Sequence, residues 1–275
     1  MELCRSHNKV ITTMKKILIA SLLALTSISA FAAPDQSGLD PAFAKVQQYL
    51  QAKNYTAAYT ELDVMAKAGN AQAMYNQAYM IQMGQGTAKN NGKALKLYQE
   101  SSDKGYSVAS YVLAQSYATG ELGLTKDAKK SKTYLEKASS QGFDDATLEL
   151  AVMAFAEGKD KEALQRIDPL IKKGNSQAIH TKALYDITQG YKTKNETLVK
   201  QGLNAIRDLA TKGYVPALMA VANMMTNGNI IEQNLPEAKK IYTALAKDNI
   251  PKAKESLDVV NKLIAEQAKQ PAPKK

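Results

Sequence analysis

A short pattern, a glycine followed four residues later by an alanine, recurs along the chain at nearly equal intervals. It occurs in five segments, which end at Ala73, Ala109, Ala146, Ala178 and Ala217, and a weaker form without the glycine ends at Ala253. Successive alanines are 36, 37, 32, 39 and 36 residues apart. A period of this length indicates stacked copies of one supersecondary unit, each of which buries its apolar face against its neighbours.

Each interval has the same internal order. A helix-like segment follows the alanine, then a polar turn with glycine, then a second helix-like segment that ends at a glycine. In the first full interval the two segments read "AQAMYNQAYMIQM" and "NGKALKLYQESSDK". Glycine is a common stop for a helix because it adopts the left-handed conformation easily. The pattern predicts an all-α fold, a right-handed solenoid of antiparallel helix pairs.

Three local features refine this prediction. Small residues fall where paired helices are expected to approach closest, at Ala78, Ala94, Ala114, Ala151, Ala163, Ala183, Ala222 and Ala238. Pro169 is expected to kink the helix that contains it, because proline lacks a backbone donor and clashes one turn back. The stretch "QGYKTKNETLVKQG", residues 189–202, is expected to form a longer turn.

The unit at residues 71–105 resembles the Sel-one-like repeat, a longer relative of the tetratricopeptide repeat. The residues that carry the resemblance are Ala71, Ala73, Gly84, Gly86, Lys93, Ala94, Tyr98 and Gly105. A second copy has Leu113, Ala114, Tyr117, Gly120 and Tyr134, and a later one has Val221, Ala222, Gly228, Glu237, Ala238 and Tyr242. Residues 144–174 look more like a plain tetratricopeptide repeat. The resemblance as a whole implies an exported bacterial repeat protein.

The repeats divide the chain into expected units at about residues 41–69, 71–105, 107–142, 144–174, 176–213 and 215–249. A capping helix is expected at residues 252–269, with Leu257, Val260, Leu263 and Ile264 on one side. Residues 33–40 are expected to be a flexible segment and residues 270–275 a disordered tail.

The N-terminal region has the three parts of a secretory signal. From Met14 the chain reads "MKKILIASLLALTSISAFAA", with two lysines, an apolar run and a small-x-small ending. Residues 1–32 are therefore expected to be a signal peptide with an N-terminal extension, cleaved after Ala32, which predicts a periplasmic or secreted protein. An uncleaved anchor is the alternative, although the run is shorter than the roughly 18 to 20 residues that a bilayer requires. Whether translation starts at Met1 or Met14 stays open.

The charge and the cysteine count exclude some partners. Cleavage would remove the only cysteine, Cys4, and lower the formal net charge from +10 to about +7. The arginines left would be Arg166 and Arg207, and arginine usually leads nucleic-acid recognition, so no nucleic-acid partner is expected. No membrane span is expected in the mature chain.

Candidate catalytic and ligand motifs are weak. The stretch "GQGTAKNNGKA" (residues 84–94) has five residues between Gly86 and Gly92 instead of the four of a Walker loop, and alanine follows its lysine. His180 would be the one histidine of the mature chain and is expected at a surface or groove, so no metal, cofactor or catalytic residue is predicted. Asp144 and Asp145 are paired carboxylates, but they begin a helix, where negative charge is favourable.

The stronger functional signal is a surface. The resemblance to tetratricopeptide arrays implies that the first helix of each unit lines the concave face. Equivalent positions then form one row at Phe43, Tyr75, Tyr111, Leu148, His180 and Met219, and a second row at Gln47, Tyr79, Gln115, Val152, Leu184 and Asn223. Aromatic, apolar and amide side chains in rows are typical of a peptide-binding surface. The alternative is that neighbouring units bury many of these side chains.

The sequence thus predicts an exported, non-catalytic scaffold that binds a protein or peptide of the cell envelope. Two alternatives stay open at this point: a cell-wall-associated enzyme or peptidoglycan- or β-lactam-binding protein, and a lysine-rich protein that associates with anionic envelope polymer. The identity of the partner and the oligomeric state are not predicted.

Overall fold

The computed structural model describes residues 41–269, and within them every regular element is a helix. The expected signal peptide (1–32), flexible segment (33–40) and tail (270–275) lie outside the described residues. The described chain divides between Ile167 and Asp168 into two compact units. The prediction of an all-α solenoid of helix pairs is confirmed.

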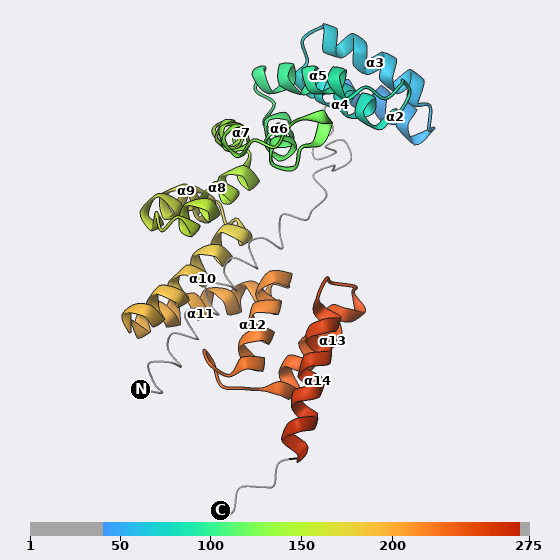
Figure 1. Ribbon diagram of the computed structural model, residues 1–275. Helices are drawn as coiled ribbons and strands as arrows, with labels where there is room; N and C mark the ends of the chain where they lie inside the picture. The colour runs from blue at the N-terminus through green and yellow to red at the C-terminus, as the bar shows by residue number, and fades with distance from the viewer. Residues whose placement is uncertain (1–40, 270–275) are drawn as a thin grey trace, which may run out of the picture. The chain divides into compact units, whose positions relative to one another are not determined.

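The first unit contains helix pairs joined by short turns (Figure 1). Its elements are η1 (Pro41–Phe43), α2 (Ala44–Gln51), α3 (Tyr55–Lys67), α4 (Ala71–Met83), α5 (Asn91–Asp103), α6 (Ser107–Thr119), η2 (Glu121–Gly123), α7 (Ala128–Ser140) and α8 (Asp144–Ala156). Helix α9 (Asp160–Lys172) includes the division between the units, and it continues through Pro169 rather than ending there.

The second unit contains the elements α10 (Ser176–Thr193), α11 (Glu196–Thr211), α12 (Val215–Asn227), α13 (Leu235–Lys247) and α14 (Ala253–Lys269). Helix α14 packs on α13 at the end of the described chain, and Val260 on α14 is buried beside Tyr242. None of the helices within residues 41–269 combines the length and the apolar character needed to cross a membrane.

The recurring alanines mark the close contacts between helices. The third residue of each first helix is an alanine with 0% exposure, at Ala73, Ala109, Ala146, Ala178 and Ala217. The eighth residue is again a buried alanine, at Ala78, Ala114, Ala151, Ala183 and Ala222. A methyl side chain lets two helix backbones approach, so the period in the sequence is the period of this packing.

The second helices contribute the larger core side chains. The eighth residue of α3, α5, α7, α9 and α13 is almost completely buried, as Leu62, Tyr98, Leu135, Ile167 and Tyr242. Four of them, Leu62, Tyr98, Leu135 and Tyr242, each pack in one cluster with a small residue of a first helix. The core is therefore a series of local clusters, one after another along the chain.

The stretch at residues 189–202 is not a longer turn, which corrects the expectation from the sequence. Helix α10 continues to Thr193 and α11 starts at Glu196, so only Lys194 and Asn195 link them. A Cβ atom at Gly202 would lie 2.6 Å from the Ala183 carbonyl oxygen, and one at Gly190 would lie 2.6 Å from Val199 Cγ2. Both glycines therefore serve the close approach of two long helices.

Candidate functional site

The structure buries part of the predicted binding surface. Of the residues proposed from the sequence, five are less than 9% exposed: Phe43, Tyr75, Leu148, His180 and Leu184. These side chains belong to the core, which corrects the expectation that they line an open face, and for His180 the expectation of a surface position. The other seven keep partial exposure: Gln47, Tyr79, Tyr111, Gln115, Val152, Met219 and Asn223.

A recurring aromatic contact covers two of these buried side chains, Tyr75 and His180. The residue before α6, α8 and α12 is aromatic, and it packs back on the fifth residue of the preceding first helix. The ring centroids are 5.2 Å apart for Tyr106 and Tyr75, and 4.8 Å for Phe143 and Tyr111. None of these aromatic residues forms a side-chain cap bond, whereas Asn70 caps α4 through a hydrogen bond.

In the second unit, His180 forms the same contact with the aromatic residue that precedes α12. Its imidazole lies 5.7 Å from the ring of Tyr214, edge to face, and is 3% exposed. Burial lowers the pKa of His180 to about 4, which a hydrogen bond with the backbone of Pro216 only partly opposes. The imidazole is therefore neutral at pH 7, and its position in the core makes it a packing residue.

Asn223 also has an internal role. Its Oδ1 atom accepts a hydrogen bond of 2.8 Å from the hydroxyl of Tyr242, which joins α12 to α13. Met219 on the same helix is half-buried and packs against the cluster of Ala222 and Tyr242. The predicted residues of the second unit thus mainly support the fold.

On α6 and α8, by contrast, polar and aromatic side chains meet at the surface. Gln115 Nε2 donates a hydrogen bond of 3.0 Å to Glu149 Oε2, which connects the two helices. Tyr111 lies one turn before Gln115 and interacts with Glu149 and Asp145. We call Tyr111, Gln115, Asp145, Glu149 and Val152 the α6–α8 surface.

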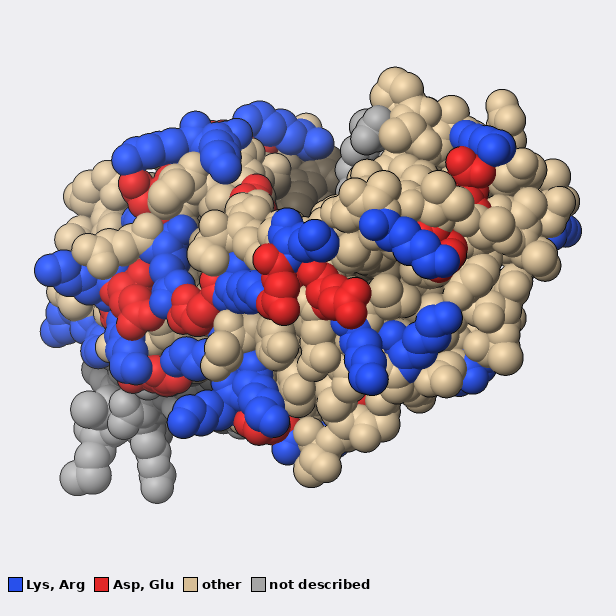
Figure 2. Space-filling model, turned by 90° about the horizontal axis from the view of Figure 1, so that it is seen from above, with Lys and Arg blue, Asp and Glu red and all other residues tan. Residues whose placement is uncertain are grey.

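Among residues 41–269, no lysine, arginine or histidine forms an ion pair with the carboxylates of the α6–α8 surface. Ion pairs within the described residues involve other acids, such as Glu136 and Glu162, which both contact Arg166. Figure 2 shows how basic and acidic side chains lie next to one another over one face of the molecule. Burial raises the pKa of Glu149, and it raises the pKa of Asp145 together with the charge of Asp144.

Glu149 and Asp145 are contact residues that the sequence reasoning missed. Asp144 and Asp145 do lie in the first turn of α8, but the residue at the cap position is Phe143, and it forms no side-chain cap bond. The spacing of Asp145, Glu149 and Val152 by four and three residues places them on one face of a helix. Glu149 lies one position after Leu148, which belongs to a predicted row. The spacing of the three residues was therefore the signal in the sequence that pointed to these carboxylates.

Other ligand chemistry has little support in the described residues. No three His, Cys, Asp or Glu side chains within residues 41–269 gather into a group that could hold a metal ion. The turn at residues 84–90 is a connection between two helices. A Cβ atom at Gly86 would lie 2.2 Å from the carbonyl oxygen of Tyr55, so this turn packs on the start of α3.

Comparison with known proteins agrees with this architecture. The family model for the Sel1 repeat matches residues 71–106, 107–143 and 215–249, which contain the pairs α4–α5, α6–α7 and α12–α13. No curated protein matches the chain.

Two solved structures share the fold. One is a Sel1 repeat protein from Oxalobacter formigenes, at 24% identity and a TM-score of 0.67, with 86% of this chain and 100% of that chain covered. The other is a protective antigen of uropathogenic Escherichia coli strains that displays an SLR fold, at 21% identity and a TM-score of 0.63. That match covers 80% of this chain and 48% of the antigen, so the chain spans about half the antigen's length. Helix pairs α4–α5, α6–α7 and α12–α13 therefore match the Sel1 repeat, and the chain shares the fold of these two solved structures.

Proposed function

We propose that the protein is a non-catalytic scaffold that binds a protein or peptide through the α6–α8 surface. The observation that carries the proposal is the connected group of Tyr111, Gln115 and Glu149, which offers apolar area and polar atoms side by side. Tyr111 is fixed from behind by Phe143, so little side-chain entropy is lost when a partner packs on it. Repeat scaffolds of this kind supply protein-interaction surfaces.

The chemistry of the surface favours a partner with a basic side chain. Asp145 and Glu149 have no ion pair within the described residues, although the whole chain has a formal net charge of +10. A lysine or arginine of the partner would reach both carboxylates and the face of the Tyr111 ring. Such a cation would also offset the burial that raises the pKa of Glu149.

A peptide selection tests the proposal. Random peptides displayed on phage are selected on the purified protein, and the enriched peptides are synthesised for Kd measurements by fluorescence anisotropy. We expect enrichment of a basic residue next to an apolar one. Tyr111→Ala and Glu149→Gln should each weaken binding about tenfold or more, because centrally placed contacts contribute over 1 kcal/mol.

The matched control is Tyr55→Ala, which removes a tyrosine that is 37% exposed at the start of a second helix. This variant should bind the peptides as the unchanged protein does. Equal loss of affinity in Tyr55→Ala and Tyr111→Ala, or no loss in Tyr111→Ala, would exclude the α6–α8 surface as the site.

We also propose that the protein is exported to the periplasm or secreted, with residues 1–32 as the cleaved signal peptide. The support is the order of lysines, apolar run and small-x-small ending before Ala33. Cell fractionation followed by N-terminal sequencing tests this proposal. The expected first residue is Ala33 in the periplasmic fraction or the medium, and an intact N-terminus in the membrane fraction would instead support an uncleaved anchor.

A further inference from the structure

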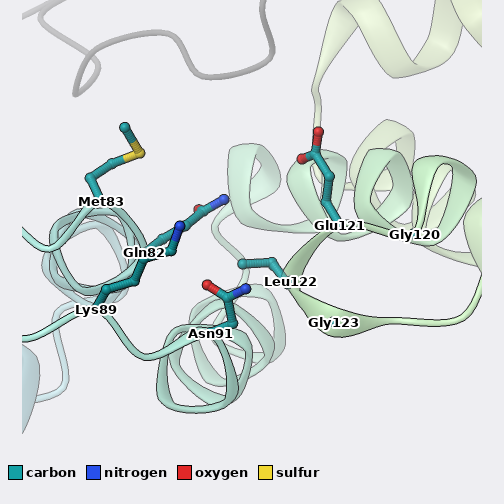
Figure 3. Close-up of a pocket in the computed structure, with 8 residues that line it drawn as sticks. All are labelled: Gln82, Met83, Lys89, Asn91, Gly120, Glu121, Leu122 and Gly123. Atoms are coloured by element: carbon teal, nitrogen blue, oxygen red, sulfur yellow. The ribbon is translucent and has the colours of Figure 1, made fainter.

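A pocket with a few polar side chains in a mainly apolar lining lies away from the α6–α8 surface, between the end of α4, the start of α5 and the turn after α6. Its volume is ≈ 520 Å³, within the range of sites that hold small ligands. Six of its lining residues carry side chains: Gln82, Met83, Lys89, Asn91, Glu121 and Leu122. Figure 3 shows the Gln82 and Asn91 amides on the side of α4 and α5, with Glu121 on the opposite wall.

Leu122 fixes the apolar wall of the pocket. Its backbone has φ 58° and ψ 17°, a left-handed conformation that costs a non-glycine residue roughly 1–2 kcal/mol. The side chain is 6% exposed and packs in the cluster that contains Ile81, Ala94 and Tyr98. Core packing therefore holds η2 against α5 despite the backbone cost.

Gln82 presents a hydrogen-bond donor to the pocket. The residue is 9% exposed, and its Oε1 atom accepts a 2.9 Å hydrogen bond from the hydroxyl of fully buried Tyr98. This bond sets the orientation of the amide, so that the amide nitrogen is left for the pocket.

Asn91 supplies the complementary acceptor. Its Oδ1 atom is screened from water and has no hydrogen-bond partner within the described residues. An acceptor without a partner costs about 1–3 kcal/mol while it stays buried, and this cost favours a rotation of the Asn91 side chain toward a donor in the pocket. Asn91 is not needed as the helix cap, because Asn90 already caps α5 by accepting a hydrogen bond from Lys93 N.

We propose that this pocket binds an amide group, such as one peptide unit with an apolar substituent. The ligand carbonyl accepts a hydrogen bond from the Gln82 amide nitrogen. The ligand N–H donates to Asn91 Oδ1, for which the Asn91 side chain turns toward the pocket. The apolar substituent packs on Leu122 and on Met83, whose side chain is 50% exposed at the rim.

The other Sel1 repeats lack this pair of amides. The positions equivalent to Gln82 and Asn91 are Ala118 and Ala128 in the second repeat, and Thr226 and Leu235 in the last one. Thr226 bonds within its own helix to the Ala222 carbonyl, and Leu235 is buried. The donor and acceptor thus belong to the first of the three repeats alone.

Titration by NMR tests the proposal with two probes. N-acetyl-leucine N-methylamide is the amide ligand, and its analogue with both N–H groups replaced by ester oxygens keeps the carbonyls and the side chain. We expect the amide to shift backbone signals of residues 82–91 and 120–123, and to bind roughly 3- to 10-fold more tightly than the ester, the effect of one hydrogen bond.

Two variants separate the contribution of the hydrogen bond to Asn91 from that of apolar packing on Met83. Asn91→Ala should lose the preference for the amide, whereas Met83→Ala should weaken both probes and keep the preference. Asn204→Ala, an exposed amide change on α11, should match the unchanged protein. The proposal is overturned if neither probe shifts these signals, if both bind equally, or if Asn91→Ala retains the preference.

Discussion

The helix pairs α4–α5 and α10–α11 contain similar sequence signals and form different structures. Between α4 and α5 the chain reverses through seven residues, 84–90, and the glycines Gly84 and Gly86 have φ near 70°. Between α10 and α11 only two residues intervene, and the glycines Gly190 and Gly202 lie inside the helices. In one pair glycine allows a turn, and in the other it allows two helices to touch.

The apolar spacing around a glycine distinguishes the two roles. Leu198, Gly202, Ile206 and Leu209 follow one another by four, four and three residues, which is one face of a continuous helix. Gly84 and Gly86 interrupt such a spacing. A glycine that occupies an apolar position of a helix therefore indicates a crossing point, and one that follows the last apolar position indicates a turn.

The largest expected effect is that of Gly86→Ala. The new Cβ would lie 2.2 Å from Tyr55 O, at a residue whose φ is 71°. Overpacking and backbone strain together should lower the free energy of unfolding by about 2–4 kcal/mol, measured by urea denaturation. Gly105→Ala is the control, because its φ is 93° but nothing lies within 4 Å of the new Cβ. An equal loss of unfolding free energy in both variants would mean that the contact between Gly86 and α3 contributes nothing to stability.

A smaller loss is expected from Gly202→Ala. The clash with the Ala183 carbonyl costs about 1–3 kcal/mol, and the better helix propensity of alanine returns up to about 1 kcal/mol. Gly92→Ala, inside α5 with its nearest neighbour 3.6 Å from the new Cβ, should instead stabilise the protein. If Gly202→Ala is as stabilising as Gly92→Ala, the two helices do not cross closely at this glycine.

The third prediction concerns acid stability, which involves His180 in the second unit. The pKa of His180 is about 4 in the folded protein and near 6.5 in the unfolded chain, so between these values only the unfolded state binds the proton. The contribution of neutral His180 to the free energy of unfolding is present above pH 6.5 and is lost as the pH falls toward 4, by at most about 1.4 kcal/mol per pH unit.

Urea denaturation at pH 7, 6, 5 and 4 checks this prediction against His180→Met, since methionine occupies the equivalent position of α12 at Met219. The variant should lose less stability over this range than the unchanged protein. The same loss in both would show that His180 does not stay neutral in the core.

Most of the fold could be predicted from the sequence. The alanines of the repeat, such as Ala73 and Ala178, are the packing positions, because helices can approach closely only over small side chains. The link between α10 and α11 was predicted wrongly, since the glycines at its ends were interpreted as turn residues. Pro169 lies within helix α9, and the kink expected there stays a prediction.

The candidate site was less predictable, because exposure depends on what the next repeat places on each side chain. Tyr75 and Tyr111 occupy the same repeat position and both contact an aromatic residue, yet Tyr75 is 2% exposed and Tyr111 is only half-buried. Tyr75 contacts Tyr98 as well, with ring centroids 5.5 Å apart. The resemblance indicated which helices to consider, and only the packing showed that Glu149 and Asp145 accompany Tyr111.

Amide hydrogen exchange tests most directly the claim that the same glycine signal encodes two structures. Residues 189–193 and 200–202 should exchange slowly, as hydrogen-bonded helix amides do, and residues 86–89 of the α4–α5 turn should exchange much faster. Exchange of residues 189–193 and 200–202 as rapid as that of residues 86–89 would contradict this claim, because it would show a long turn where the structure has two crossing helices.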